Sequence, residues 1–526
     1  MSAAQFLLMA ISCLGPPAEF QIVMEPMARW ASPRVREGAV EISAFAPDLG
    51  RLYTTSQSSM SVLAFELNTK ASILNLVAQF DLSNYGQQIQ SVAYHSGLQA
   101  VVVAIAPAVT TDSGTLVLLH AHDGSLLRKY PTGVLPDMVG VSENGRWIVT
   151  ADEGQPSEDY QSDPVGSVTI LDTTTMTAQT VDFRTIEPEM VDPQVIVSAP
   201  AGTTFAQDAE PEYVTFSSDN QFAYISLQEN NAIAKIDLER GSWLWVKSMG
   251  SIDHRKNRNA IDASDRDGGI NINPQPVFGL PMPDAISSFQ VGGGDYIATA
   301  NEGDAREYGA FGNSSRVQKV HLDPVQFPDA PDLKSEHNLG RLKILNTHGD
   351  IDGDGDCDVL YSFGSRSLSI LDADGNRIAD TGSLIEQKLN QYDPEHFNAN
   401  NDRVSSRDSR SDDRGPEPEG VVVGVVEGIP IAFLGLERPS GIMAFDCSNP
   451  FEPTFSSYAT TRNNNQSIDL SGDLGPEGLC FIKAKDSPTG EALLVVSYEV
   501  SGSICIFKVS KKNAGPLPQK QGSPAP

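Results

Sequence analysis

An acidic residue recurs directly after proline, and each time a second acid follows after a short apolar run. The repeats are spaced by roughly 50–75 residues, which is typical of an architecture built from repeated units. Each unit therefore delivers carboxylates to the same structural position. The first acid of each unit is Asp137, Glu212, Asp284, Glu419 or Glu477, and the second is Glu153, Glu229, Glu302, Glu437 or Glu499.

Carboxylates that converge on one axis repel one another unless protons, arginines or metal ions neutralise them. The repeat therefore predicts a divalent metal in a central channel. Its candidate ligands are Asp137, Glu212, Asp284, Glu302, Glu419 and Glu477. The alternative is that each acid accepts hydrogen bonds only from backbone N–H groups of its own turn, as Asp and Glu readily do.

A second acidic motif lies between residues 350 and 358, where the sequence reads DIDGDGDCD. Acids at alternate positions of a loop wrap a hard cation, and Gly355 supplies the tight turn. The bidentate glutamate expected at the twelfth position is replaced by Tyr361, so affinity depends on a carboxylate from elsewhere. The predicted ligands of this Ca²⁺ site are Asp350, Asp352, Asp354, Asp356 and Asp358.

Arg306 and Arg438 lie close to acids of the repeat and are candidate contacts for an anion such as phosphate. Pairing with neighbouring acids is the alternative for each of them. The chain contains none of the nucleophile elbow, HExxH or phosphate-loop motifs that mark common hydrolases.

The acids must be positioned by strands, because short β-rich runs separated by Gly, Asn, Asp and Pro dominate the chain. Several short strands in each repeated unit predict an all-β fold, a single β-propeller with long inserted loops. Seven blades are expected, and eight if residues 358–383 form a blade of their own. The strand 20–24 is expected to pair with the last blade and close the ring. Residues 253–282 and 384–416 are expected to be long loops.

The length, composition and net charge of the chain limit its possible partners and its organisation. The chain has 526 residues, 40% of them hydrophobic, and a net charge of −31. This charge disfavours nucleic acid as a partner and favours cations. We expect a weak or truncated signal segment at 1–19, the propeller at 20–510 with its calcium loop near 350–358, and a disordered tail at 511–526.

No run is long enough to span a bilayer. The sequons at Asn313 and Asn465 are candidate glycosylation sites on an exported chain. The five cysteines lack CxxC spacing; buried free thiols are expected for Cys447, Cys480 and Cys505, with a Cys480–Cys505 bridge as the alternative. The sequence does not define the oligomeric state.

Several longer motifs share one family pattern. They are NEGDAREY from Asn301, GPEPEG from Gly415, AFLGLER from Ala432, AQDAEPEY from Ala206, GDLGPEGL from Gly472 and DASDRDGGINI from Asp262. Between about residues 38 and 509 the chain resembles the choice-of-anchor I family, which includes mesenchyme-specific cell-surface glycoproteins of echinoderm biomineralisation. The resemblance implies a YVTN/WD40-like propeller that is exported and located outside the cell or at its surface. Some bacterial relatives are labelled alkaline phosphatase.

Two functions are compatible with these observations, and the third possibility is a purely structural scaffold whose acids only cap turns. The first is an extracellular Ca²⁺-binding propeller that binds a matrix or mineral surface. The second is a metal-dependent phosphoric-ester hydrolase, with the channel acids holding metal and Arg306 or Arg438 holding phosphate. The residues leave open whether the protein is an enzyme.

Overall fold

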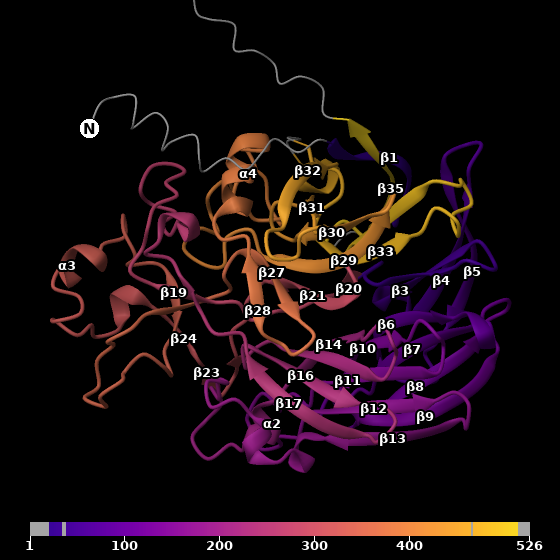
Figure 1. Cartoon of the computed structure of the whole chain (residues 1–526), viewed down its shortest axis with the longest axis horizontal. Helices are drawn as coiled ribbons and strands as arrows, with labels where there is room; N and C mark the ends of the chain where they lie inside the picture. The colour runs from indigo at the N-terminus through magenta and orange to yellow at the C-terminus, as the bar shows by residue number, and fades with distance from the viewer. Residues whose placement is uncertain (1–19, 34–37, 464–466, 514–526) are drawn as a thin grey trace, which may run out of the picture.

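The computed structural model describes residues 20–33, 38–463 and 467–513. In this part of the chain the strands form seven four-stranded antiparallel sheets, together with a five-stranded sheet and a two-stranded hairpin. The sheets follow one another in chain order from indigo to yellow (Figure 1). The all-β prediction is confirmed, and the fold is a β-propeller.

The strands of each four-stranded sheet run from the inside outward. The first strands are β2 (Ser43–Ala46), β6 (Gln88–His95), β10 (Pro136–Val141), β14 (Pro211–Phe216), β20 (Ile286–Val291), β29 (Pro418–Val426) and β33 (Pro476–Ile482). The second strands are β3 (Arg51–Ser56), β7 (Ala100–Ala106), β11 (Trp147–Asp152), β15 (Phe222–Leu227), β21 (Gly294–Asn301), β30 (Ile429–Leu436) and β34 (Ala492–Tyr498).

The outer half of each sheet completes the pattern. The third strands are β4 (Ser61–Asn68), β8 (Ser113–His120), β12 (Ser167–Asp172), β16 (Ala232–Asp237), β27 (Ser367–Asp372), β31 (Gly441–Asp446) and β35 (Ser503–Asn513). The fourth strands are β5 (Ile73–Asp81), β9 (Leu126–Val134), β13 (Thr177–Asp182), β17 (Ser242–Ser248), β28 (Arg377–Asp380), β32 (Thr454–Thr460) and β1 (Phe20–Ala31).

Burial along the strands explains their sequences. The middle strands β7 and β34 are buried at every position, because neighbouring sheets cover both of their faces. Such strands are continuous apolar runs rather than alternating ones. The outer strand β5 is exposed at most positions, and its exposed side chains include the apolar Ile73, Leu76 and Val77.

Contacts between first strands follow a complete circuit. β2 contacts β6, β6 contacts β10, β10 contacts β14, β14 contacts β20, β20 contacts β29, β29 contacts β33, and β33 contacts β2. All seven first strands line one central cavity of about 400 Å³. Residues that begin these strands therefore lie around one mouth of a shared space.

The seventh sheet joins the two ends of the described chain. β1 pairs antiparallel with β35, with Phe20 opposite Asn513, so the predicted pairing of this strand with the last sheet is confirmed. β35 extends to Asn513, three residues into the segment where disorder was expected. Residues 1–19, with the expected signal segment, and 514–526 lie outside the described residues.

The fifth sheet is divided along the chain. Strands β20 and β21 pair with β27 and β28, which lie beyond residues 302–366. Within the segment 358–383, residues 367–380 therefore supply the outer half of this sheet, whereas residues 361–363 pair within the insertion.

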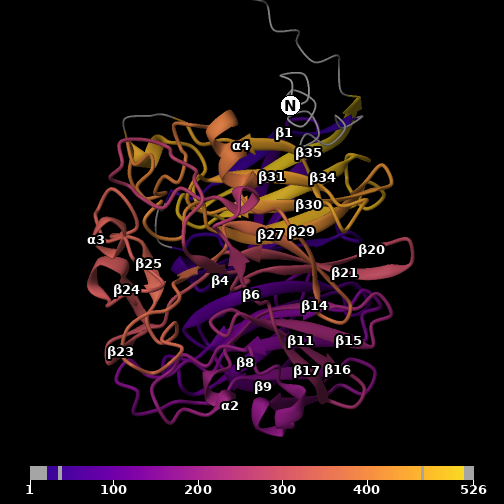
Figure 2. The same ribbon diagram turned by 60° about the vertical axis from the view of Figure 1, so that its left-hand side comes forward.

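The insertion between β21 and β27 forms its own small sheet together with residues 252–280. Its strands are β18 (Ile252–Asp253), β19 (Phe278–Leu280), β26 (Tyr361–Phe363), β25 (Lys343–Leu345) and β24 (Ser314–Arg316). The hairpin β22 (Glu307–Tyr308) and β23 (Phe311–Gly312) lies beside it. The expected loop 253–282 thus contributes two short strands, and this body lies to one side of the sheets in both views (Figures 1 and 2).

Helix is scarce in the described residues. The α-helices are α2 (Phe205–Asp208), α3 (Ala330–Leu333) and α4 (Leu384–Tyr392). The expected loop 384–416 begins with α4, whose Ile385 and Leu389 are fully buried against the neighbouring sheets. None of the helices in the described ranges has the length and apolar character needed to cross a bilayer.

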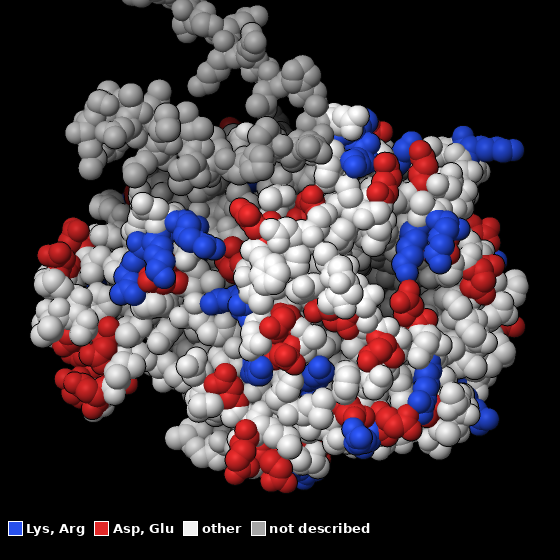
Figure 3. Space-filling model, viewed as in Figure 1, with Lys and Arg blue, Asp and Glu red and all other residues white. Residues whose placement is uncertain are grey.

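The described cysteines Cys357, Cys447, Cys480 and Cys505 are free thiols. The Cys480–Cys505 bridge is therefore not formed. On the face drawn in Figure 3, acidic side chains gather over the insertion at the left of the view.

Candidate functional site

The Pro-acid dipeptides create β-bulges at the start of the first strands. In the third sheet Pro136 pairs with Asp152 and Met138 with Ala151, so Asp137 is the extra residue. The same register shift follows Pro211, Pro418 and Pro476. A bulge locally bends the strand and re-aims a side chain. In these four sheets the bulge thus turns one acid toward the common axis, whereas Asp284 precedes β20, whose pairing with β21 shows no register shift.

The second sheet has the bulge without the acid. Its register shifts between Ile89 and Ser91, and the residue between them is Gln90. The Gln90 Nε2 atom donates a hydrogen bond to Asp137 Oδ1 over 3.2 Å. An amide at the equivalent position explains why the acidic pattern does not include this sheet.

The structure brings five of the six predicted channel ligands into two clusters. Asp137 and Glu212 join Glu153 in one, and Asp284, Glu302 and Glu419 form the other. Within each cluster, one carboxylate oxygen of every residue lies within 4.8 Å of the others. Glu477 lies outside both clusters, although its charge contributes to the raised pKa of Glu419.

Burial raises the pKa of these carboxyl groups. The pKa of Asp137 rises to about 6 and that of Glu302 to about 7. The pKa values of Glu153, Glu212 and Asp284 are raised well above their ordinary range by burial and then by neighbouring carboxylates. The arrangement thus stores negative charge that a proton or a cation must balance.

Arginines neutralise one side of the mouth. Glu417 is fully buried and pairs with Arg410, Arg414 and Arg438. Arg414 also contacts Glu302 over 3.0 Å. The cluster Glu302, Glu417 and Glu437 is therefore held together by guanidinium groups, and Glu302 is shared between this network and the cluster of Asp284 and Glu419.

The two predicted anion contacts are engaged by acids. Arg438 contacts Glu417 over 2.8 Å and Glu437 over 3.0 Å, with 22% of its side chain exposed. The side chain of Arg306, the other predicted anion contact, is 1% exposed and pairs with Glu210 and Asp208. Arg306 thus has no free face for phosphate.

Asn313, a predicted glycosylation site, lies in the interior of the structure. Its side chain is fully buried, accepts a hydrogen bond from the Arg306 N–H over 3.0 Å, and donates one to Ser198 Oγ over 3.1 Å. The folded arrangement therefore leaves no exposed amide at Asn313 that could carry a glycan. Asn465 lies outside the described residues.

The acidic loop 350–358 forms two overlapping carboxylate clusters. One contains Asp350, Asp352 and Asp358, and the other contains Asp356, Asp358 and Asp323. Asp354 belongs to neither. Gly353 and Gly355 adopt positive φ angles of 80° and 98°, and their N–H groups donate to Asp350, so the turn expected at Gly355 is present.

Sequence reasoning missed Asp323, a carboxylate from outside the loop that lies beside Asp356 and Asp358. It is placed by backbone pairing: the Asp323 N–H donates to the carbonyl oxygen of Cys357 over 3.0 Å, and Leu322 forms a bridge with Cys357. Its separation of 27 residues from Asp350 left no local signal. Glu153 and Glu417 were also not among the predicted ligands, although Glu153 follows the repeat pattern.

Glu41 precedes the first strand of the first sheet and provides a pH-dependent test of the crowded acids. Burial, then Glu499 and Asp137, raise its pKa from 4.5 to about 8. A carboxyl group with a raised pKa binds a proton more tightly in the folded state, so its stability contribution is lost as pH rises from 4.5 toward 8. We expect Glu41→Gln to increase the free energy of unfolding at pH 8 by about 2–4 kcal/mol.

Urea unfolding of both proteins from pH 5 to pH 8, in the presence of a chelator, measures this effect. The two curves should converge near pH 5. A difference that does not depend on pH contradicts the prediction.

Comparison with known proteins gives two curated relatives. Gigasin-3a of Magallana gigas is 32% identical over 201 residues, which is 36% of this chain and 70% of that protein. The mesenchyme-specific cell surface glycoprotein of Strongylocentrotus purpuratus is 30% identical over 295 residues, which is 48% of this chain and only 37% of that protein.

Solved structures with a similar arrangement include a hydrazine synthase of Kuenenia stuttgartiensis, with a TM-score of 0.47, 11% identity and coverage of 90% of this chain and 97% of that chain. A streptogramin B lyase structure has a TM-score of 0.45 and 9% identity, and covers 94% of this chain and 100% of that chain. The model of the choice-of-anchor I domain matches residues 41–450. This match extends over most of the sequence, and the chain belongs to the choice-of-anchor I family.

Proposed function

We propose that this protein is an extracellular or cell-surface β-propeller that binds Ca²⁺ through the loop 350–358 and engages a matrix or mineral surface. The observation that carries the proposal is that Asp358 belongs to two carboxylate clusters, one with Asp350 and Asp352 of the same loop and one with Asp356 and Asp323, the last from outside the loop. Oxygen ligands from a flexible acidic loop suit Ca²⁺. The surface location is supported by the family and by the relative named as a cell surface glycoprotein.

The architecture proposed with this function is one closed propeller of seven blades. Its support is the circuit of contacts between the first strands and the pairing of β1 with β35. In such a ring the insertion stands apart from the channel, so the loop can meet a surface while the sheets act as a rigid base.

A mineral or matrix partner fits the electrostatics. The net charge of −31 attracts cations, and bound Ca²⁺ at an exposed acidic loop can bridge to anions of a surface. The hydrolase alternative loses Arg306 as a phosphate contact, because that guanidinium is buried between Asp208 and Glu210. The binding function is therefore the one proposed.

Calcium should raise the melting temperature of the protein, because an ion that binds only the folded state stabilises it. We expect a rise of several degrees at millimolar Ca²⁺, a smaller rise in Asp350→Asn/Asp352→Asn, and a weaker apparent affinity in Asp323→Asn. The matched control is Asp112→Asn, which removes an exposed acid outside the loop.

Calorimetry and thermal melting with Ca²⁺ measure these effects. An unchanged Ca²⁺ response in the double variant excludes the loop as the site. Sedimentation with calcium mineral particles then tests the surface partner, and the double variant should be retained less than the control.

A further inference from the structure

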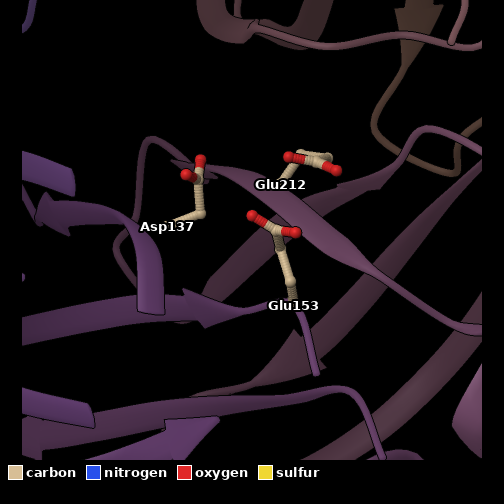
Figure 4. Close-up of side chains that lie close together, drawn as sticks. All are labelled: Asp137, Glu153 and Glu212. Carbon is tan, nitrogen blue, oxygen red and sulfur yellow. The ribbon is translucent and has the colours of Figure 1, made fainter. Parts of the chain in front are cut away.

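Three carboxylates from two neighbouring sheets face one another beside the central cavity. Asp137 lies in β10, Glu153 directly follows β11, and Glu212 lies in β14. Figure 4 shows their carboxyl groups pointing toward one another. One oxygen of each lies within 4.8 Å of the others. Oxygens bound to one Ca²⁺ at about 2.4 Å can be no farther apart than roughly twice that distance, so this spacing fits a shared cation.

Glu153 contributes an oxygen that lacks a partner. Its side chain is 4% exposed, and its Oε2 atom has no hydrogen-bond partner among the described residues. Glu229 lies beside this cluster and is 8% exposed. Its Oε2 atom also has no hydrogen-bond partner among the described residues. Buried polar atoms normally have partners, because leaving them unpaired is costly. A bound cation would give these carboxylate oxygens the partner that they lack.

The cluster also differs from its arginine-bound counterpart. Glu302, Glu417 and Glu437 are neutralised by Arg410, Arg414 and Arg438. By contrast, none of the ion pairs formed within residues 20–33, 38–463 and 467–513 involves Asp137, Glu153 or Glu212. The hydrogen bond that reaches Asp137 from the second sheet comes from the neutral amide of Gln90.

Access to the cluster is open from the cavity. Asp137 and Glu212 are half-buried, and the residues that follow them, Met138 and Tyr213, line the central cavity. An ion can therefore reach the cluster through solvent without opening the sheets.

We propose that Asp137, Glu153 and Glu212 bind a hard divalent cation at the mouth of the central cavity. Gln90 orients Asp137 for this task, and Glu229 adds negative charge beside the ion. The site goes beyond the calcium loop of the proposed function and is independent of it. Its ion links the third and fourth sheets through their innermost strands.

The test uses the full chain and two probes, Ca²⁺ and Mn²⁺. The loop variant Asp350→Asn/Asp352→Asn/Asp358→Asn isolates the cavity site, and Glu153→Gln is then added to it. We expect the loop variant to retain one bound ion by calorimetry and to show a protein-bound Mn²⁺ signal in electron paramagnetic resonance. Adding Glu153→Gln should weaken this binding at least tenfold.

Two controls keep the result interpretable. Glu41→Gln neutralises another crowded acid and should leave ion stoichiometry unchanged. Because Glu153→Gln removes an unpaired buried charge, the ion-free variant should melt no lower than its parent, and the ion should raise the melting temperature of the parent only. A folded loop variant that binds neither probe, or equal affinity with and without Glu153→Gln, overturns the proposal. Failure of the calcium loop appears separately, as unchanged ion stoichiometry on mutating the loop.

Discussion

Replacing Arg306 by methionine is expected to lower the free energy of unfolding by about 3–5 kcal/mol. The Arg306 side chain is 1% exposed, and the carboxylates of Asp208 and Glu210 beside it are equally buried. Its guanidinium also donates to the carbonyl oxygen of Asp208 over 2.6 Å. Methionine fills similar volume but leaves two buried carboxylates without a counter-ion, which is the costly way to break a buried ion pair.

Urea unfolding at pH 7 measures this loss. The matched control is Arg240→Met, because Arg240 pairs with Asp237 while 77% of its side chain is exposed; a change below about 1 kcal/mol is expected there. Arg306→Lys should fall between the two, since it keeps the charge but not the planar fork. A loss for Arg306→Met as small as that of the control contradicts the assignment of Arg306 to a structural role.

Glu417→Gln is expected to cost a similar 3–5 kcal/mol at pH 7, because it leaves three guanidinium groups facing one another without their shared carboxylate. Burial alone would raise the pKa of Glu417, but Arg414, Arg438 and Arg410 outweigh it and lower the pKa to about 2. The residue has a positive φ of 49°, and glutamine meets the same backbone strain. The substitution therefore isolates the charge.

The pH dependence of this effect has a defined sign. A depressed carboxyl pKa contributes stability that is fully present above the unfolded value of 4.5 and is lost as pH falls toward 2. The difference between wild type and Glu417→Gln should therefore shrink between pH 5 and pH 2. Denaturant titrations across this range measure it, with the exposed Glu452→Gln as control. A difference that stays constant down to pH 2 argues against the arginine network.

Much of the fold could be predicted from local sequence patterns. The Pro-acid dipeptides marked the bulged starts of four first strands, because a bulge depends on a few adjacent residues. The apolar run at 20–24 was also recognisable as an edge strand from its own residues. The insertion was not predicted as a sheet, since strands of two or three residues such as β18 and β25 are too short to show a period.

Which residues meet at the site depends on contacts between segments that lie far apart along the chain, and local sequence patterns do not reveal these contacts. Arg306 meets Asp208 and Glu210 from about a hundred residues away along the chain, so its exposure could not be judged from its neighbours. Asn313 belongs to a sequon but is buried beside that ion pair. The repeat predicted that acids would gather, whereas which of them acquire arginine partners was decided by the loop that carries Arg410 and Arg414.

The pairing of β1 with β35 has a mechanical consequence. Phe20 lies opposite Asn513. A force that pulls the two ends of the described chain apart would therefore act first on the hydrogen bonds at this end of the β1–β35 pair. Its hydrogen bonds would then open one after another, as a zipper does, rather than share the load in shear. Tension applied between these two ends therefore meets little resistance from the β1–β35 pair.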